Sequence, residues 1–455
     1  MTFDHRSVEL LEDALRSLEE GFRHLPDLSE RIDPEEVRSA LRATAERMRD
    51  NFPYHHPLYI GQMLKPPHPV ARLAYALAMW INPNNHALDG GRASSAMEKE
   101  AVSQIARMFG WETHLGHLCS GGTMANFEAL WISRELRPGK SVAASTQAHY
   151  THSRLAAVLG VPFTSIDADA RGRMDLAALE RALATGVVGT VVVTLGTTAA
   201  GAMDPLPEVF ELRKRYDFRI HVDAAYGGYF TLASNLDAKT RRAFDALAQV
   251  DSIVVDPHKH GLQPYGCGCV LFRDPDVGRF YRHDSPYTYF SSGDLHLGEI
   301  SLECSRPGAS AAALWATLRV FPLERRGAFA ADLDACREAA MALHDALQKD
   351  ARFAPLFPPE LDIVLWAVRA STAREASALA RRVFEAAARR DLHLALATIP
   401  RAMAEPAAAV RNWDADDILC LRACVMKPEH RAWMPEILNR LRIAADDLCG
   451  ARSGT

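Results

Sequence analysis

Four short segments of the sequence carry residue types that could do chemistry on a small molecule. Residues 120–126, SGGTMAN, begin a predicted helix whose free N–H groups and dipole could hold a phosphate. Asp223 and Lys259 each follow an apolar stretch, in HVDAAY and in DPHKHG. Residues 195–198 add hydroxyl groups after the stretch GTVVV. Each segment alone could be a capped helix, a turn or a solvated lysine, whereas the set offers a phosphate cradle, a buried carboxylate and a reactive amine.

That set matches the needs of one cofactor, pyridoxal 5′-phosphate. A carboxylate beside the pyridine nitrogen keeps that nitrogen protonated, so that the ring acts as an electron sink, and a lysine holds the aldehyde as an imine. A metal site is the weaker interpretation. Cys267 and Cys269 lie close after His258 and His260, but zinc sites usually pair cysteines across a wider spacer. We therefore expect no metal.

The elements that must position these residues are predicted to be the strands of one parallel sheet. Between about residues 95 and 275, helical segments alternate with short, continuously apolar strands, a pattern typical of a sheet that is covered on both faces. The clearest strands are residues 190–195, 219–222 and 252–255. In such sheets ligands gather beyond the carboxyl ends of the strands, where three of the four segments begin.

Three regions are predicted along the chain. Residues 1–80 contain two helices and then a segment rich in proline and aromatic residues, which we expect at a subunit interface because an isolated chain offers it no obvious surface. Residues 81–321 are predicted to form the large cofactor-binding domain. Over residues 322–455, Ala- and Arg-rich amphipathic helices alternate with two strand-like stretches, which indicates a smaller C-terminal α/β domain.

Composition argues against several classes of protein. The 455 residues are 48% hydrophobic and 24% charged, as in a globular protein rather than a disordered or fibrous one. The formal net charge is −5 and no basic stripe is present, so neither nucleic acid nor an anionic membrane is an expected partner. No apolar run approaches the ~18 residues of a membrane span. The first residues carry acidic charges and lack a signal-peptide core, so we expect a cytoplasmic location.

The order and wording of these segments resemble one known family. From about residue 56 to residue 321, the stretches HPLYIGQM, SGGTMANFEAL, AHYTHSR, TLGTT, HVDAAYGG, DPHKHG and SRPGA are similar to those of the pyridoxal-phosphate-dependent group II amino acid decarboxylases, which include aromatic amino acid and glutamate decarboxylases. The resemblance implies the α/β aspartate-aminotransferase-like (type I) fold, with a large, mostly parallel sheet domain and a smaller C-terminal α/β domain. It also implies a homodimer with active sites at the interface.

The resemblance gives roles to individual residues. Lys259 is expected to form the Schiff base, Asp223 to meet the pyridine nitrogen, and His149 to stack on the cofactor ring. Ala225 would pack on the opposite ring face, where a bulky side chain could not fit. The remaining expected cofactor-binding residues are Gly121, Gly122, Thr123, Thr197, Asp256 and His258.

Further residues are expected to act on the substrate. Tyr287, in a stretch after the lysine, is the first candidate to deliver a proton to the substrate carbon, and Tyr289 is the second. Arg306 could organise the site or meet a carboxylate. Asn85 and His86 stand where relatives contact the substrate side chain, and they could bind a polar or phenolic group, cap a helix or face a second subunit.

The predicted function is decarboxylation of an L-amino acid to its amine and CO2, with an aromatic substrate such as tyrosine first and a glutamate-like acid second. An aldehyde synthase of the same fold is the main alternative, and the two tyrosines lean against it. A carbon–carbon lyase would need a second phosphate site, for which the sequence shows no obvious basic cluster. The His149 pattern argues against an aminotransferase, and the intact Lys259 and Asp223 argue against a non-catalytic carrier.

Overall fold

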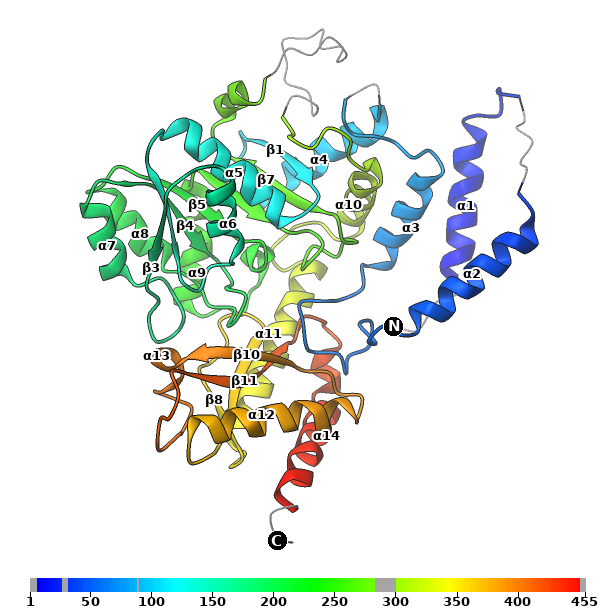
Figure 1. Cartoon of the computed structure of the whole chain (residues 1–455). Helices are drawn as coiled ribbons and strands as arrows, with labels where there is room; N and C mark the ends of the chain where they lie inside the picture. The colour runs from blue at the N-terminus through cyan, green and yellow to red at the C-terminus, as the bar shows by residue number, and fades with distance from the viewer. Residues whose placement is uncertain (1–5, 27–31, 88–89, 283–299, 451–455) are drawn as a thin grey trace.

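The computed structural model describes residues 6–26, 32–87, 90–282 and 300–450, except for the side chains of 447–450. Within these ranges, the apolar strands after residue 110 form one sheet of seven strands with helices on both faces (Figure 1). Every residue of β2, β4, β6 and β7 is buried, as expected for strands that are covered on both sides. The strands are β1 (Leu115–Cys119), β2 (Ser141–Ser145), β3 (Phe163–Ile166), β4 (Val188–Thr194), β5 (Arg219–Asp223), β6 (Ser252–Val255) and β7 (Gly268–Phe272).

The order of the strands brings the chemistry-bearing segments to one edge. The sheet runs β1-β7-β6-β5-β4-β2-β3, and the strands from β6 to β3 pair in parallel, which confirms the mostly parallel sheet. β7 runs antiparallel to both β6 and β1, a detail that the sequence did not predict. In the register of the central strands, Thr194 pairs with Asp223 and Asp223 with Val254, so β4, β5 and β6 end at one level.

The helices of the large domain cover the sheet and close its ends. α5 begins two residues after β1 and packs across β7 and β6, so its first turn faces the carboxyl edge of the sheet. α3 and α4 both pack against α10. These helices are α3 (Pro69–Met79), α4 (Arg92–Met108), α5 (Gly122–Leu136), α6 (Thr151–Val158), α7 (Leu176–Ala184), α8 (Leu206–Arg213), α9 (Ala238–Asp245) and α10 (Gly308–Val320).

A second, four-stranded antiparallel sheet forms the C-terminal part of the chain, in the order β10-β11-β9-β8. Two of its strands, β9 and β11, correspond to the two strand-like stretches of the sequence. The strands are β8 (Phe353–Pro355), β9 (Ile363–Val368), β10 (Ala395–Pro400) and β11 (Asp417–Cys424). The helices are α11 (Ala328–Gln348), α12 (Ala373–Ala388), α13 (Arg401–Ala404) and α14 (His430–Gly450), of which α11, α12 and α14 pack together.

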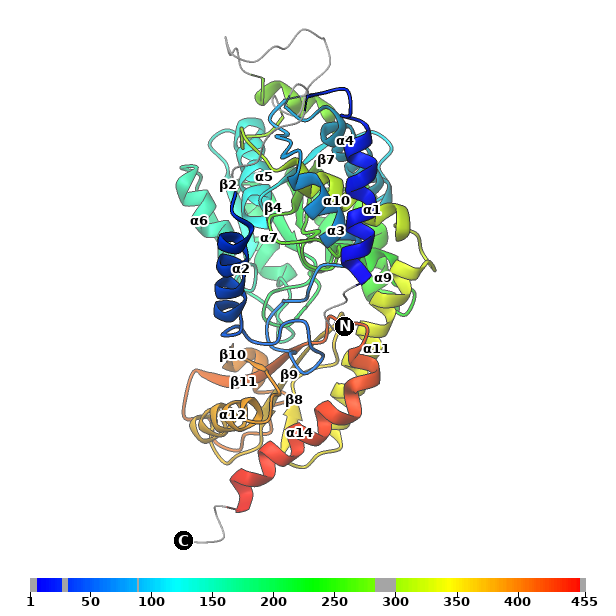
Figure 2. The same ribbon diagram turned by 90° about the vertical axis from the view of Figure 1, so that its right-hand side faces the viewer.

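Two N-terminal helices lie at the periphery of the chain (Figures 1 and 2). α1 (Arg6–Glu20) contacts α3, and neither α1 nor α2 (Pro34–Met48) has a buried residue. Both helices were predicted, and an N-cap at Asp33 followed by Pro34 explains where α2 begins. Among the described helices, none has both the length and the apolar content of a bilayer span.

Part of the proline- and aromatic-rich segment packs within this chain. Leu58, Tyr59 and Ile60 are buried against the C-terminal sheet, whereas the interface expected for this segment stays a prediction. The Ile60 N–H donates to the carbonyl of His393 at 2.9 Å, and the Cys424 N–H donates to the carbonyl of Ile60 at 2.8 Å. The segment therefore ties the N-terminal region to the C-terminal domain.

Lys427 is buried at this junction. Its Nζ donates to the carbonyl of Tyr59 at 2.7 Å and lies 5.4 Å from the centre of the Tyr59 ring. Burial, with a smaller contribution from the charge of Lys65, lowers the pKa of Lys427 to about 7. In the unfolded chain a lysine keeps a pKa of ~10.4. Between these two values the unfolded state binds more protons than the folded state, so this residue makes the free energy of unfolding rise with pH.

We therefore expect Lys427→Met to remove a pH-dependent part of stability. Urea denaturation of both proteins at several pH values from about 7 to 10 measures it. The free energy of unfolding of the native protein, minus that of the variant, should increase across this window. A constant difference would contradict the lowered pKa of Lys427.

Candidate active site

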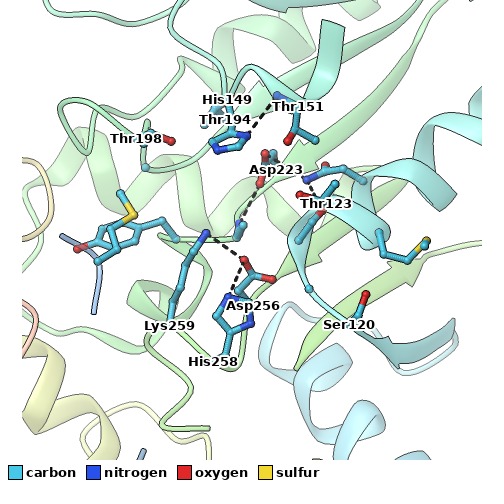
Figure 3. Close-up of a pocket in the computed structure, with 18 residues that line it drawn as sticks. Ser120, Thr123, His149, Thr151, Thr194, Thr198, Asp223, Asp256, His258 and Lys259 are labelled. Carbon is cyan, nitrogen blue, oxygen red and sulfur yellow. Dashed lines mark hydrogen bonds and ion pairs between the residues drawn. The ribbon is translucent and has the colours of Figure 1, made fainter. Parts of the chain in front are cut away.

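A cavity of about 300 Å³ opens at the carboxyl ends of β4, β5 and β6 (Figure 3). All four of the segments that we singled out in the sequence contribute to its walls. The expected cofactor-binding residues that line it are Gly121, Gly122, Thr123, His149, Asp223, Ala225, Asp256, His258 and Lys259. The fold thus brings a lysine, a carboxylate and a helix N-terminus into one cavity.

Asp223 ends β5 and is buried, yet it stays ionised. Its Oδ1 accepts the N–H of Ala225 at 3.0 Å, and its Oδ2 lies 2.8 Å from Nε2 of His152 and 3.4 Å from Nδ2 of Asn126. Burial alone would raise the pKa of Asp223, but the hydrogen bond and charge of His152, the charge of Lys259 and the Ala225 N–H outweigh it and lower the pKa. This carboxylate can therefore face a cation in the cavity.

His149 precedes α6 and shares the cavity with Asp223 (Figure 3). Its Nδ1 accepts the N–H of Thr151 at 3.3 Å, which fixes the ring from the N-terminal end of the helix. Burial lowers the pKa of His149, although the charge of Asp223 opposes this shift. The ring is therefore mostly neutral at pH 7, as a flat group that stacks on another ring should be.

Lys259 lies in the loop after β6, beside a second carboxylate. Its Nζ is 2.9 Å from Oδ2 of Asp256, which also lies 3.6 Å from Nε2 of His258. Nδ1 of His258 donates to the carbonyl of Cys267 at 2.8 Å, so this nitrogen carries the proton. Burial lowers the pKa of His258, in spite of the nearby Asp256 charge. The loop is thus anchored while the amine of Lys259 reaches the cavity.

The first turn of α5 forms an anion cradle on the same cavity. Gly122 and Thr123 begin the helix, where backbone N–H groups lack partners within the helix. A Cβ on Gly122 would lie only 2.7 Å from Oδ2 of Asp256, so a side chain here would collide with the lysine's partner. Oδ1 of Asp256 is buried without a hydrogen-bond partner among the described residues and could accept a hydrogen bond from a donor, but not from an ionised phosphate. The N–H groups of this turn, Lys259 and the ionised Asp223 are the features that fit pyridoxal 5′-phosphate.

Thr197 occupies a different place from the one expected. It is fully buried, its Oγ1 accepts the N–H of Ala202 at 3.0 Å, and it does not line the cavity. Thr198, the next residue, lines the cavity together with Thr194 at the end of β4 (Figure 3). The hydroxyl groups predicted at this edge are present, but the turn at Gly196 and Gly201 directs a different threonine toward the ligand.

Asn85 and Arg306 belong to a buried network outside the cavity lining. Arg306 contacts Oε1 of Glu98 at 2.7 Å, and Asn85 donates to Oε2 of Glu98 at 2.6 Å and accepts from Ser94 at 2.5 Å. Glu98 also accepts the N–H of Leu118 at the end of β1. Both residues hold the chain around β1 in place, so a direct contact with substrate in the same chain is not supported.

The structure says less about the other three residues that we expected to act on the substrate. His86 does not line the cavity in this chain, although its Nδ1 is buried and lacks a hydrogen-bond partner among the described residues. Tyr287 and Tyr289 lie outside the described residues. Their roles stay predictions.

The sequence analysis assigned no role to four polar residues around Asp223, namely Asn126, His152, His221 and Ser252. Asn126 accepts from Nε2 of His221 at 2.9 Å, and Nδ1 of His221 lies 2.8 Å from the hydroxyl of Ser252. His152 contacts Asp223 directly. His149 and His152 are three residues apart, which is about one helical turn. This spacing could have pointed to His152 in the sequence. No group of three or more His, Cys, Asp or Glu side chains in the described part could hold a metal ion.

Comparison with known proteins identifies the family. Residues 54–369 match the family model of the pyridoxal-dependent decarboxylase conserved domain. The chain is 27% identical to the L-tyrosine decarboxylase of Enterococcus faecium, over 80% of this chain and 77% of that one. It is 31% identical to a probable L-tyrosine/L-aspartate decarboxylase of Methanoculleus marisnigri, over 64% of this chain and 77% of that one. Among solved structures, Oryza sativa TDC with PLP and tryptamine has a TM-score of 0.78 at 19% identity, covering 98% of this chain and 97% of that one.

The chain is a pyridoxal-phosphate enzyme with the type I fold, as the sequence predicted. More narrowly, the chain belongs to the pyridoxal-dependent decarboxylase family. It is a carboxy-lyase that uses pyridoxal 5′-phosphate to remove the carboxylate of an amino acid as CO2.

The anion cradle generates a prediction. Gly122→Ala should raise the dissociation constant of pyridoxal 5′-phosphate roughly ten- to a hundredfold, because overpacking of this kind costs about 1–3 kcal/mol. Absorbance titration of the cofactor-free protein measures it. Gly327→Ala is the control, since Gly327 precedes α11 and a Cβ there would have its nearest neighbour at 3.3 Å. Equal affinities for Gly122→Ala and the native protein would show that the cradle does not hold the phosphate.

Proposed function

We propose that this decarboxylase acts on an L-amino acid with a neutral aromatic side chain, with L-tyrosine as the first candidate. The observation that carries the proposal is the charge of the cavity. Among the described residues that line it, Lys259 is the one lysine or arginine. Burial lowers the pKa values of His149 and His258, so neither histidine offers an acidic side chain a full positive charge at pH 7.

The apolar part of the cavity supports the same substrate class. Met63, Met124 and Tyr226 line it and could contact an aromatic ring. The relatives named above include one L-tyrosine decarboxylase and one probable L-tyrosine/L-aspartate decarboxylase. An acidic amino acid is therefore the second candidate, and it would need a cation from outside the described lining.

The named cavity residues each have a task in the proposed reaction. When bound, pyridoxal 5′-phosphate accepts the electron pair of the breaking bond between Cα and the carboxylate. Nζ of Lys259 would hold the cofactor through its carbonyl carbon. The ionised Asp223 would keep a proton on the pyridine nitrogen, and His149 and Ala225 would contact the ring. The backbone N–H groups at Gly121, Gly122 and Thr123, together with His258, would hold the phosphate.

A proton must also reach Cα after CO2 leaves. We assign this step to Tyr287, with Tyr289 or His149 as alternatives, because the resemblance implies a proton-donating tyrosine in the stretch after the lysine, and phenol and imidazole groups can serve as general acids. If oxygen reacts before that proton arrives, the product is an aldehyde, so the identity of the product also tests this step.

We further propose that a second copy of the chain covers α1 and α2. Val37, Leu41 and Met48 lie on one face of α2 and are exposed, Leu41 by 64% and Met48 by 63%. Exposed apolar groups of this extent on a helix without any buried residue mark an interaction surface. A homodimer with shared active sites, as the resemblance implies, would bury them.

The substrate is tested by incubating the cofactor-loaded protein separately with L-tyrosine, L-phenylalanine, L-tryptophan, DOPA, L-aspartate, L-glutamate and 2,4-diaminobutyrate, and identifying the products by mass spectrometry. We expect tyramine, with kcat/KM for tyrosine at least about tenfold above that for aspartate, since an unpaired buried charge costs several kcal/mol. Lys259→Ala, the control, should give no amine. A preference for aspartate or glutamate would contradict the aromatic substrate, and an aldehyde would indicate the oxidative alternative.

The dimer is tested by light scattering on a sizing column. The native protein should elute at twice the mass of one chain, and Leu41→Asp should shift it toward the monomer and lower activity. Val187→Asp, at a similarly exposed apolar residue outside α1 and α2, is the control and should leave the mass unchanged. A native monomer with full activity would rule out the shared site.

A further inference from the structure

His152 is the nearest partner of Asp223, and the reaction described above gives it no task. Its Nε2 lies 2.8 Å from Oδ2 of Asp223, and both side chains are buried. His152 lies in α6 whereas Asp223 ends β5, so the contact joins two elements that approach only in the folded chain. His152 does not line the cavity, so it acts on a ligand only through Asp223.

The other hydrogen bonds to Asp223 leave His152 as the main donor to Oδ2. Asn126 lies at the long distance of 3.4 Å from the same oxygen, and its Nδ2 also donates to the carbonyl of Gly122 at 2.8 Å. The Ala225 N–H serves Oδ1. Without His152, Oδ2 would keep one weak and shared hydrogen bond. A buried carboxylate in that state binds a proton more readily.

The geometry also fixes which nitrogen of His152 carries the proton. The ionised carboxylate can only accept, so Nε2 must be the donor. Nδ1 of His152 is buried and has no hydrogen-bond partner among the described residues, so the contact with Asp223 is the one hydrogen bond of this ring among them.

The charged groups around this pair are few. Lys259 and His149 face Asp223 from the cavity, and Asp256 lies beside Lys259. Behind the pair, burial lowers the pKa of His221 to about 3, so His221 is a neutral link between Asn126 and Ser252. His152 is thus the group whose removal most directly changes how strongly Asp223 holds a proton.

We propose that His152 is a positioning residue that, through Asp223, keeps the pyridine nitrogen of the bound cofactor protonated. The proposal rests on the role given to Asp223 above. A carboxylate that loses its strongest donor becomes more basic, and the proton between ring nitrogen and carboxylate moves toward the carboxylate. The electron sink weakens, so kcat should fall about ten- to a hundredfold while KM changes little.

The test is nitrogen-15 NMR of the protein loaded with pyridoxal 5′-phosphate labelled at the ring nitrogen, together with kcat and KM. His152→Leu removes the donor, and we expect the nitrogen signal to move toward the unprotonated value. His152→Gln places an amide N–H near the position of Nε2 and should restore the native signal and most of kcat. His152→Asn is one bond shorter, cannot reach Oδ2, and should behave like His152→Leu.

His117→Leu is the matched control. His117 is likewise a buried histidine beside a carboxylate, with Nε2 2.9 Å from Oε2 of Glu128 but outside hydrogen-bond geometry, and it does not line the cavity. We expect His117→Leu to lower the melting temperature and leave the nitrogen signal at its native value. A signal that moves equally in His117→Leu and His152→Leu would assign the effect to general loosening and overturn the proposal.

Asp223→Asn distinguishes a failure of this proposal from a failure of the role proposed for Asp223. If the ring nitrogen of the cofactor stays protonated in Asp223→Asn, Asp223 does not have the assigned role. If Asp223→Asn moves the signal but His152→Leu keeps the native signal and kcat, His152 is merely structural and only the present inference fails. Should His152→Leu not retain the cofactor, the pair of His152→Gln and His152→Asn decides, because equal signals in these two variants would contradict a donor role.

Discussion

The site depends on keeping one buried carboxylate ionised. Moving a charge out of water costs many kcal/mol unless other groups replace its hydration, and Asp223 is almost fully buried. Three donors from different elements replace that hydration: His152 from α6, Asn126 from α5 and the N–H of Ala225 after β5. The parallel arrangement of β4, β5 and β6 makes this possible, because it ends the three strands at one level beneath the N-termini of α5 and α6.

The lysine loop has a second set of constraints, which come from the C-terminal domain. His260 follows Lys259 directly and lies 3.2 Å from Oδ2 of Asp362, just before β9, while the hydroxyl of Tyr226 donates to Oδ1 of Asp362 at 2.7 Å. Burial raises the pKa of Asp362, but His260 and Tyr226 outweigh it and lower the pKa. Since Tyr226 also lines the cavity, this buried contact couples the position of the amine to the packing of the two sheets.

Some conspicuous residues of the sequence serve the scaffold. Arg306 and Asn85 are held by Glu98, which also binds the backbone of β1 just before the anion cradle. The polar network thus fixes the strand from which Gly121 and Gly122 extend. A residue can therefore belong to a chemistry-bearing motif because it positions the backbone that would contact the cofactor. Such a residue need not contact the cofactor itself.

The sequence by itself determined the three central strands, the mostly parallel sheet, the smaller C-terminal domain and the cofactor. Short apolar stretches followed by Asp223, Lys259 and SGGT carry that information locally, because burial on both faces demands continuous apolar strands and because helix starts bind anions. The tertiary structure decided the rest. Whether Thr197 or Thr198 faces the cavity depends on a turn, and the contact of His152 with Asp223 depends on how α6 lies against β5. The burial of Leu58–Ile60 depends on the C-terminal sheet, which is far away along the chain. These are long-range contacts between elements, and no local pattern of residue types specifies them.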